Sequence, residues 1–398
     1  MSLTAVTEEQ RVSDLVDQLL AEFPPKKVDT VTFLGAQFDK GLAWVHFPEG
    51  HGGLGVNPKL QKVVNERIYA EGAPNPMFRN PIGHGMCGPT VVAWGSEEQK
   101  RRYLRPLFTG EEIWCQLFSE PGSGSDFAGL SSRGVKDGDE WIVNGQKVWT
   151  TLAHLSRWGL LVVRTDSEAV KHHGLTAFVV DMHDPNVEVR PLRQMTGEAE
   201  FNEVYFTDVR IPDAERLGTP GEGWRVSLTT LMNERVSIGG AIPQKGSGTI
   251  AHLMRGWSEA PEWQKDASTR DRVMQLWIRA ETLRLTNIRA NQNRKMGDPG
   301  PEGSIGKMAS ANLNKDIYEC LMDVMGAEAL LYGSYEMVRP EHAMEFATPQ
   351  KAFLRSRANS IEGGTTEVML NILGERVLGL PGDVRVDREL PWSKVPRN

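Results

Sequence analysis

The spacing of apolar residues changes twice along the chain, and this order constrains the fold more than any other feature. From Glu8 to Phe23 apolar residues recur at helical spacing, and helix-compatible stretches continue from Lys59 to Glu71 and from Ser96 to Phe108. We therefore predict a helical N-terminal domain over residues 1–112.

Short β-type runs dominate the next hundred residues. Asp137-Gly138 and Asn144-Gly145 are turn dipeptides, and the second predicts a hairpin between residues 141–143 and 147–149. Further strands are expected at Gly159–Val163, Leu175–Val180, Val187–Val189 and Glu203–Ile211. These patterns predict an all-β middle domain over residues 113–215.

Helical spacing returns after Gly221-Glu222-Gly223 and continues to the end of the chain. Trp224, Leu228, Leu231 and Ile238 share one helical stripe. Later helices are expected at Val273–Arg294, Ile305–Met325 and Thr365–Leu378, with a loop at 297–303. Helical, β and helical blocks in this order favour an α+β architecture whose third domain covers residues 216–398.

Charge and motif content narrow the function. The 45 Lys and Arg are outnumbered by 52 Asp and Glu, so nucleic acid is not an expected partner. Neither an apolar run of about 18–20 residues nor a secretory signal is present, which predicts a cytoplasmic protein without membrane contact. The three cysteines are widely spaced and the H-E-x-x-H motif is missing, so a metal site is not expected. The G-x-G-x-x-G motif is also missing, so a Rossmann cofactor site is not expected.

The stretch from Cys115 to Leu130, CQLFSEPGSGSDFAGL, carries the strongest chemical signal. Gly122 and Gly124 let a ligand approach the backbone, and the neighbouring serines supply hydroxyls and amides suited to a pyrophosphate. Trp149-Thr150-Thr151 adds an aromatic plane and hydroxyls, as an isoalloxazine ring would need. The alternative interpretations are an ordinary Gly/Ser turn and a core tryptophan.

Several segments in order resemble the acyl-CoA dehydrogenase family. FSEPGSGSD at 118–126 and NGQKVWTT at 144–151 are similar to its paired flavin-binding signature. Other similar segments are WVHFPEGHGGLG (44–55), GSEEQKRRYL (95–104), FNEVYFTDVRIP (201–212), LMNERVSIGG (231–240) and IEGGTTEVMLNILGERVLGLP (361–381). The resemblance covers the chain from about Glu8 to Pro381.

This resemblance implies a fold and an activity. In the family an N-terminal helical domain, a middle β-barrel or sandwich domain and a C-terminal four-helix bundle surround FAD. The implied reaction is α,β-dehydrogenation of an acyl-CoA to the trans-2-enoyl-CoA, with electron-transferring flavoprotein as acceptor. The implied assembly is a homodimer or homotetramer.

The resemblance also assigns site residues. Gln116, Phe118 and Ser119 are expected at the flavin ring edge, and Ser125 at the cofactor pyrophosphate or the CoA of the substrate. The remaining flavin contacts are Trp149, Thr151, Thr365 and Glu367, and Arg235 is assigned to substrate binding.

Two glutamates are candidates for the base that removes the α-proton while a hydride leaves the β-carbon. In many family members the base directly precedes the Gly-Thr of the terminal loop, where this chain has Gly363, one residue after Glu362. Other members place it in an L-x-x-E-R sequence, which Leu231–Arg235 matches. Glu234 also projects from the apolar helical stripe, where burial would raise its pKa. We therefore predict Glu234 as the base, with Glu362 as the alternative, and the N–H of Gly363 as donor to the thioester carbonyl.

Two departures from the family bear on the assembly. The R-x-x-F-G segment that many members use across a subunit interface is not found between Gly256 and Gln275, and Q-x-x-G-G is replaced by Asp323–Ala327. One alternative is therefore a subunit of a heterotetramer acting on steroid side-chain CoA esters. The others are an acyl-CoA oxidase and a non-catalytic partner subunit.

Overall fold

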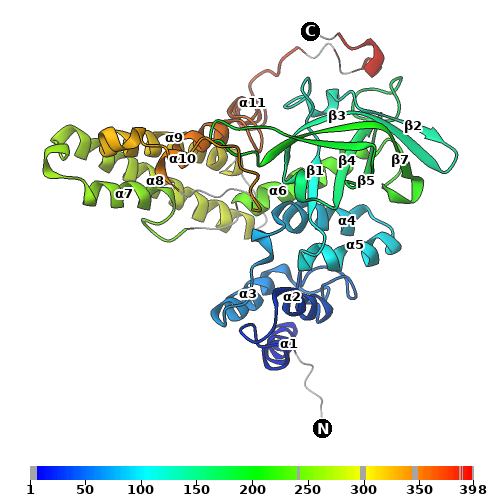
Figure 1. Cartoon of the computed structure of the whole chain (residues 1–398), viewed down its shortest axis with the longest axis horizontal. Helices are drawn as coiled ribbons and strands as arrows, with labels where there is room; N and C mark the ends of the chain where they lie inside the picture. Colours follow the sequence, from blue (N-terminus) through cyan, green and yellow to red (C-terminus); the bar gives the residue numbers. More distant parts are fainter. Residues whose placement is uncertain are drawn as a thin grey trace.

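Three blocks of secondary structure follow one another along the chain in the helical, β, helical order expected from the sequence (Figure 1). The computed structural model describes residues 7–239, 243–295, 302–342, 348–384, 387 and 389–396. The α+β prediction is confirmed.

The N-terminal helices begin and end where local sequence signals place them. The Thr7 side chain accepts a hydrogen bond from the N–H of Gln10, and Ser96 with Gln99 forms a capping box at the start of α5. Gly110 ends α5 in the left-handed conformation, at φ 74°. The helices are α1 (Glu8–Glu22), α2 (Thr30–Asp39), α3 (Gln61–Ala70), α4 (Gly88–Trp94) and α5 (Glu97–Thr109).

The middle block is one eight-stranded sheet in the order β6-β7-β3-β2-β4-β5-β8, with β1 paired to β4 in parallel. Most of the remaining pairings are antiparallel. The strands are β1 (Trp114–Leu117), β2 (Arg133–Asp137), β3 (Glu140–Thr151), β4 (Trp158–Arg164), β5 (Leu175–Asp181), β6 (Val187–Pro191), β7 (Phe201–Pro212) and β8 (Arg216–Leu217).

The prediction of a hairpin at Asn144-Gly145 is wrong. Strand β3 runs through this dipeptide, and its register against β7 shifts between Val143 and Gly145. The bulge absorbs the irregular backbone that the dipeptide favours. The turn lies instead at Asp137-Gly138, between β2 and β3, with Gly138 at φ 60°.

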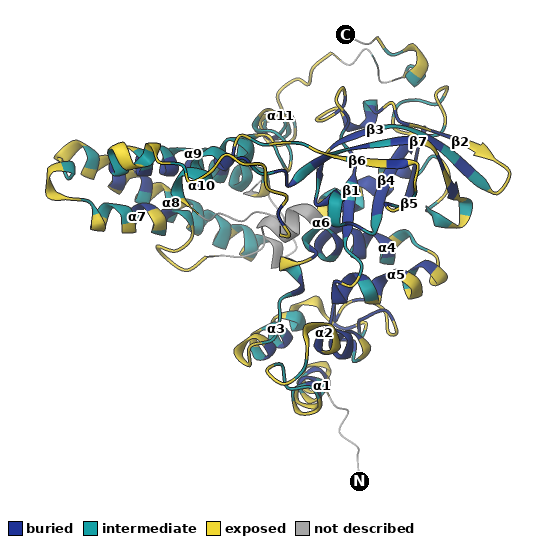
Figure 2. Ribbon diagram, viewed as in Figure 1, coloured by how far each residue is buried: buried dark blue, intermediate teal, exposed yellow. Residues whose placement is uncertain are grey.

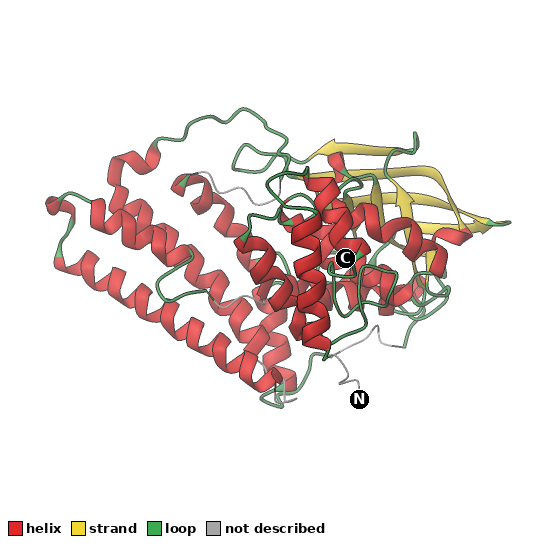
Figure 3. Cartoon of the chain, turned by 90° about the horizontal axis from the view of Figure 1, so that it is seen from below, coloured by secondary structure: helices red, strands yellow, loops and turns green. Residues whose placement is uncertain are grey.

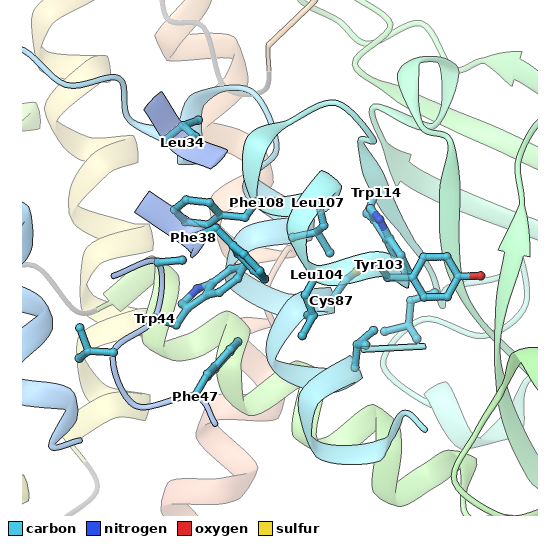
Figure 4. Packing of buried hydrophobic residues seen from close by; sticks show 14 of the residues in the cluster. Leu34, Phe38, Trp44, Phe47, Cys87, Tyr103, Leu104, Leu107, Phe108 and Trp114 are labelled. Atoms are coloured by element: carbon cyan, nitrogen blue, oxygen red, sulfur yellow. The ribbon is translucent and has the colours of Figure 1, made fainter. Parts of the chain in front are cut away.

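Apolar clusters cover both faces of β4. Leu160 and Val162 belong to a cluster shared with the N-terminal helices, whereas Leu161 and Val163 belong to a second cluster shared with β3 and β7. Figure 4 shows part of the first cluster, in which Trp44 packs between Phe47 and Phe108. The strands at the centre of the sheet are accordingly buried (Figure 2).

The C-terminal helices form a bundle beside the sheet (Figure 3). Helices α7, α8, α9 and α10 share a third apolar cluster, which includes Leu253, Leu276, Ile317 and Ala352. Helix α6 instead packs on the first two blocks, where the Thr230 and Thr90 hydroxyls lie 2.9 Å apart. The helices are α6 (Gly223–Gly239), α7 (Thr249–Glu259), α8 (Ala267–Lys295), α9 (Glu302–Met325), α10 (Pro349–Ser356) and α11 (Thr366–Arg376).

Helices α7 and α10 were not expected from the sequence. Most of the loop predicted at 297–303 lies outside the described residues. No helix within the described part of the chain is both long enough and apolar enough to cross a bilayer.

Candidate active site

The two sequence segments singled out for cofactor binding lie side by side. Residues 118–126 follow β1, and residues 144–151 form the C-terminal part of β3. The N–H of Val148 donates to the carbonyl of Ser119 at 2.9 Å, which fixes the backbones of both segments together. Gln116, half-buried in β1, directly precedes this junction.

A buried ion pair strengthens the junction. The Lys147 side chain is completely buried, and its Nζ donates to Oε1 of Glu120 at 2.8 Å and to the carbonyl of Phe118 at 3.1 Å. Glu120 also accepts the backbone N–H groups of Ser131 at 2.6 Å and Ser132 at 3.0 Å. Sequence reasoning missed this pair, although both residues lie within the quoted motifs.

Burial lowers the pKa of Lys147 below its ordinary value, although the Glu120 carboxylate opposes this shift. Burial alone would raise the pKa of Glu120, but the ammonium of Lys147 and the N–H of Ser131 outweigh it and hold that pKa below its ordinary value. A charged carboxylate accepting several hydrogen bonds is a stable anchor for a loop. The Glu120 carboxylate therefore ties residues 118–120 to residues 131–132.

Trp149 is the most unusual residue of the site. It adopts a left-handed backbone at φ 60°, which is rare for a bulky side chain, and its side chain is 57% exposed. The register of β3 against β7 shifts between Lys147 and Thr150, so a bulge turns Trp149 out of the regular alternation. The alternative of a core tryptophan is wrong, and the exposed indole is free to stack on a ligand.

Aromatic rings continue from this junction towards α6. Phe118 is buried and stacks on Phe127 with ring centroids 4.8 Å apart, and Phe127 stacks on Trp224 at 6.0 Å. Trp224 lies in the first turn of α6. The Phe118 ring therefore packs against Phe127, and Phe127 connects the loop to α6 through Trp224.

The outer side of the 118–126 loop is open. Ser125 is exposed, and a Cβ built on Gly122 or Gly124 would meet no atom within 4 Å. Open backbone and hydroxyl groups on an anchored loop provide hydrogen-bond donors for a phosphate.

The terminal loop carries the other predicted contacts. Thr365 caps α11, where its hydroxyl accepts from the N–H of Val368 at 3.1 Å, and Glu367 is exposed in the first turn. Gly363 and Gly364 both have positive φ, at 62° and 92°. The left-handed conformation at 363 suits a glycine.

Glu362 is engaged by a guanidinium. Its two carboxylate oxygens accept from the forked nitrogens of Arg355 at 3.1 Å and 2.8 Å, and Oε1 also accepts from Nδ2 of Asn359 at 2.8 Å. The Arg355 side chain is only 6% exposed. A carboxylate held in this bidentate arrangement is oriented towards its partner.

Arg355 also connects the terminal loop to Trp149. Its guanidinium carbon lies 5.6 Å from the ring centroid of Phe201, and Phe201 meets Trp149 edge to face at 5.9 Å. Phe201 in turn pairs with Thr151 across β7 and β3. The 118–126 loop, the 144–151 strand end and the terminal loop therefore converge around Trp149. Phe201 and Arg355 connect them, and neither residue was assigned a role from the sequence.

Glu234 and Arg235 lie in α6, but their side chains are outside the described residues. The described half of this helix is anchored, because Ser227 and Thr230 are fully buried.

The described site fits a flavin. It combines an exposed indole, a glycine-rich loop with open backbone and a half-buried Thr151 on the same strand end. Planar aromatic and hydrogen-bonding groups of this kind hold the ring and phosphate parts of such a cofactor. Within the described part of the chain, no three metal-ligating side chains gather as they would around a metal ion.

Three family models match consecutive parts of the chain. The N-terminal domain of acyl-CoA dehydrogenase matches residues 9–111, the middle domain residues 115–209 and the C-terminal domain residues 221–378. Together they span most of the sequence.

Similar proteins of known sequence agree. The chain is 36% identical to acyl-CoA dehydrogenase IpdE1 of Mycobacterium tuberculosis, over 87% of this chain and 86% of the relative. It is 35% identical to acyl-CoA dehydrogenase FadE34 of the same organism, over 86% of this chain but 45% of that longer protein.

Solved structures share the fold. A steroid acyl-CoA dehydrogenase, Tcur3481-Tcur3483, has a TM-score of 0.69 at 23% identity, covering 96% of this chain and 100% of that one. The ChsE4-ChsE5 complex of Mycobacterium tuberculosis also has a TM-score of 0.69, at 24% identity and the same coverage.

Proposed function

The chain belongs to the acyl-CoA dehydrogenase family and is an oxidoreductase acting on acyl-CoA, and from this premise we propose that it binds FAD and converts an acyl-CoA thioester to the trans-2-enoyl-CoA. The family is flavin-dependent. The chain's own contribution would be to bind the thioester, exclude water and remove the α-proton.

The observation that carries this proposal is the conformation of Trp149. An exposed indole on a strained, bulged backbone needs a functional reason, since an ordinary surface position would relax to a favourable conformation. The buried Lys147–Glu120 pair holds the adjacent loop in place beside it. A stacked isoalloxazine would cover the exposed ring.

FAD would supply the acceptor for the hydride that leaves the β-carbon. A carboxylate oxygen of Glu234 would take the proton from the α-carbon, and the N–H of Gly363 would donate to the thioester carbonyl. Ser125 and Arg235 would bind the polar part of the substrate. Gln116, Ser119, Thr151, Thr365 and Glu367 would complete the cofactor site.

The choice of Glu234 over Glu362 rests on what Glu362 already does. Its oxygens are occupied by Arg355 and Asn359, so releasing it for proton transfer would leave the buried guanidinium without its partner. Position 234 in α6 follows the buried Thr230 by one helical turn and the buried Ser227 by two. That spacing supports a base held on an anchored helix.

A second candidate is a subunit of a heteromeric enzyme that acts on steroid side-chain CoA esters. The family's R-x-x-F-G segment is missing in the 256–275 region, where α7 ends at Glu259 and α8 begins at Ala267. The replaced Q-x-x-G-G falls at the junction of α9 and the following turn, where Gly326 has φ 59°. A non-identical partner would then complete the adenosine end of the cofactor site in place of a second copy.

Electron-transferring flavoprotein is the proposed acceptor, with the reaction taking place in the cytoplasm and the enzyme a homodimer or homotetramer in the simpler case. An acyl-CoA oxidase would instead reduce oxygen. Peroxide formation during turnover in air, without an added acceptor, distinguishes the oxidase from the dehydrogenase.

The test is anaerobic bleaching of the bound flavin by a panel of acyl-CoAs, from short linear chains to steroid side-chain esters. We expect a yellow protein whose flavin absorbance falls with at least one member of the panel. A purified protein that is colourless and takes up no FAD when it is added in excess would contradict the proposal for the chain alone. Repeating the test with a coexpressed partner subunit then examines the heteromeric candidate.

A further inference from the structure

The last described residues of the chain return to the middle domain. Residues 387 and 389–396, here called the C-terminal strap, come after α11 in the sequence and lie beside the sheet, where Figure 1 shows the red end of the chain. The N–H of Trp392 donates to the carbonyl of Ala169 at 3.0 Å, and that of Ser393 to Ser167 at 2.9 Å. The strap is thus hydrogen-bonded to the loop between β4 and β5.

The strap also contacts the segment that follows Ser125 and Asp126. The indole Nε1 of Trp392 donates to the carbonyl of Gly129 at 3.2 Å. The neighbouring carbonyls of Ala128 and Leu130 accept from Arg164 at 2.6 Å and 3.2 Å. Three successive carbonyls are therefore held, and the middle one is held by the end of the chain.

Arg164 and Trp392 act as one unit. The guanidinium carbon of Arg164 lies 4.4 Å from the ring centroid of Trp392, and the Arg164 side chain is buried. A guanidinium stacked on an indole face gains a cation–π attraction that grows when water is excluded. The strap thereby fixes the arginine that holds the loop, in addition to holding Gly129 itself.

A charge bridge links the strap to the loop at a second point. The Nζ of Lys171 lies 2.8 Å from Oδ2 of Asp126 and 2.7 Å from Oδ2 of Asp387, and its side chain is only 12% exposed. Asp126 directly follows Ser125, which is exposed. One lysine of the β4–β5 loop therefore joins the strap to the end of the glycine-rich segment.

From these contacts we propose that the C-terminal strap is a positioning element for residues 125–130, with Trp392 and Asp387 as positioning residues that set the affinity of Ser125 and its loop for the phosphate groups of the ligand. The inference rests on the proposed function, in which Ser125 binds a pyrophosphate. The strap touches the loop from the side of Gly129 and Asp126 and takes no part in the proton transfer.

The experiment compares three full-length variants. Trp392→Ala removes both the Nε1 donor and the stacking on Arg164, Trp392→Phe removes the donor alone, and Asp387→Asn weakens the bridge to Lys171. Lys394→Ala is the matched control, because Lys394 is exposed and lies in the same strap. Each is measured for the FAD dissociation constant of the apoprotein, for KM and kcat, and for amide exchange at Gly129 and Leu130.

We expect Trp392→Ala to raise the FAD dissociation constant or the KM for acyl-CoA about three- to tenfold, as the loss of one hydrogen bond and one cation–π contact implies. The kcat at saturating ligand should stay within about twofold, since such contacts act on binding rather than on the chemical step. Trp392→Phe should recover part of the loss. Amide exchange at Gly129 and Leu130 should accelerate, and Lys394→Ala should behave as wild type.

Unchanged exchange and unchanged ligand affinity in both Trp392→Ala and Asp387→Asn would overturn the proposal. So would equal effects of Lys394→Ala, which would point to general loosening of the strap. If the wild-type protein binds no FAD, the proposed function fails, and the strap is then judged on amide exchange alone.

Discussion

The Nζ of Lys147 lies 2.8 Å from Oε1 of Glu120, with the lysine side chain 0% and the glutamate side chain 7% exposed. This pair joins the glycine-rich loop to the strand that carries Trp149. Removing one partner would leave the other buried without a counter-charge, which is the costly way to break such a pair.

We predict that Lys147→Met lowers the free energy of unfolding by about 3–5 kcal/mol. The double variant Lys147→Met with Glu120→Gln should recover part of that loss, because it leaves no buried charge. Urea denaturation of the apoproteins measures both effects, with Arg190→Met in the exposed Glu188–Arg190 pair as control. A loss no larger than that of the control would contradict the role assigned to the pair.

The lowered pKa of Glu120 predicts a loss of stability in acid. In the folded protein Glu120 titrates below its ordinary value of 4.5, because Lys147 and Ser131 outweigh the effect of burial. Its contribution is therefore fully present above about pH 4.5 and is lost as the pH falls through the lower, folded-state pKa.

The measurement is denaturation of wild type and of the double variant between pH 3 and pH 6. The wild-type stability should fall more steeply below pH 4.5 than that of the variant, which carries no carboxylate at position 120. Parallel curves would show that Glu120 does not contribute to the acid dependence.

Trp149→Ala should weaken FAD retention much more than it lowers the melting temperature of the apoprotein. The exposed indole packs edge to face on Phe201 but is not part of a core cluster. Stacking on an aromatic ligand is worth about 0.5–1.5 kcal/mol beyond the area buried, so a tenfold or larger rise in the dissociation constant is expected.

Trp141→Ala is the matched control for this prediction. Trp141 belongs to the same strand but is 5% exposed and packs in the second apolar cluster. It should lower the melting temperature strongly, as loss of a core aromatic does. Similar losses of melting temperature in both variants would contradict the role of Trp149 as a ligand contact that contributes little to stability.

The helical and β blocks could be predicted from the sequence because their signals are local. The capping box at Ser96 and the apolar spacing from Glu8 both act within a few residues of each other. The hairpin prediction at Asn144-Gly145 failed because β3 pairs there with β7, some sixty residues away in the sequence. In that pairing the dipeptide forms a bulge and not a turn.

The site could be predicted only where the residues lay in short motifs. Both segments of the flavin signature were found, but nothing local says that Lys147 is buried against Glu120 or that Trp149 is exposed. The ion pair between Glu362 and Arg355 could not be predicted from the sequence either, since it depends on the turn between α10 and α11. Such contacts depend on how distant segments pack.

The identity of the base is the central claim, and single-turnover bleaching of the flavin tests it most directly. Glu234→Gln and Glu362→Gln are each mixed anaerobically with saturating acyl-CoA, and the rate of flavin reduction is compared with wild type. Glu234→Gln keeps the shape of the side chain but removes its basicity, so reduction should slow by roughly 10²–10⁴-fold while substrate still binds. Glu362→Gln should change the rate much less, because its carboxylate is held by Arg355. Abolished bleaching in Glu362→Gln, with a near wild-type rate in Glu234→Gln, would contradict the account and place the base on the terminal loop.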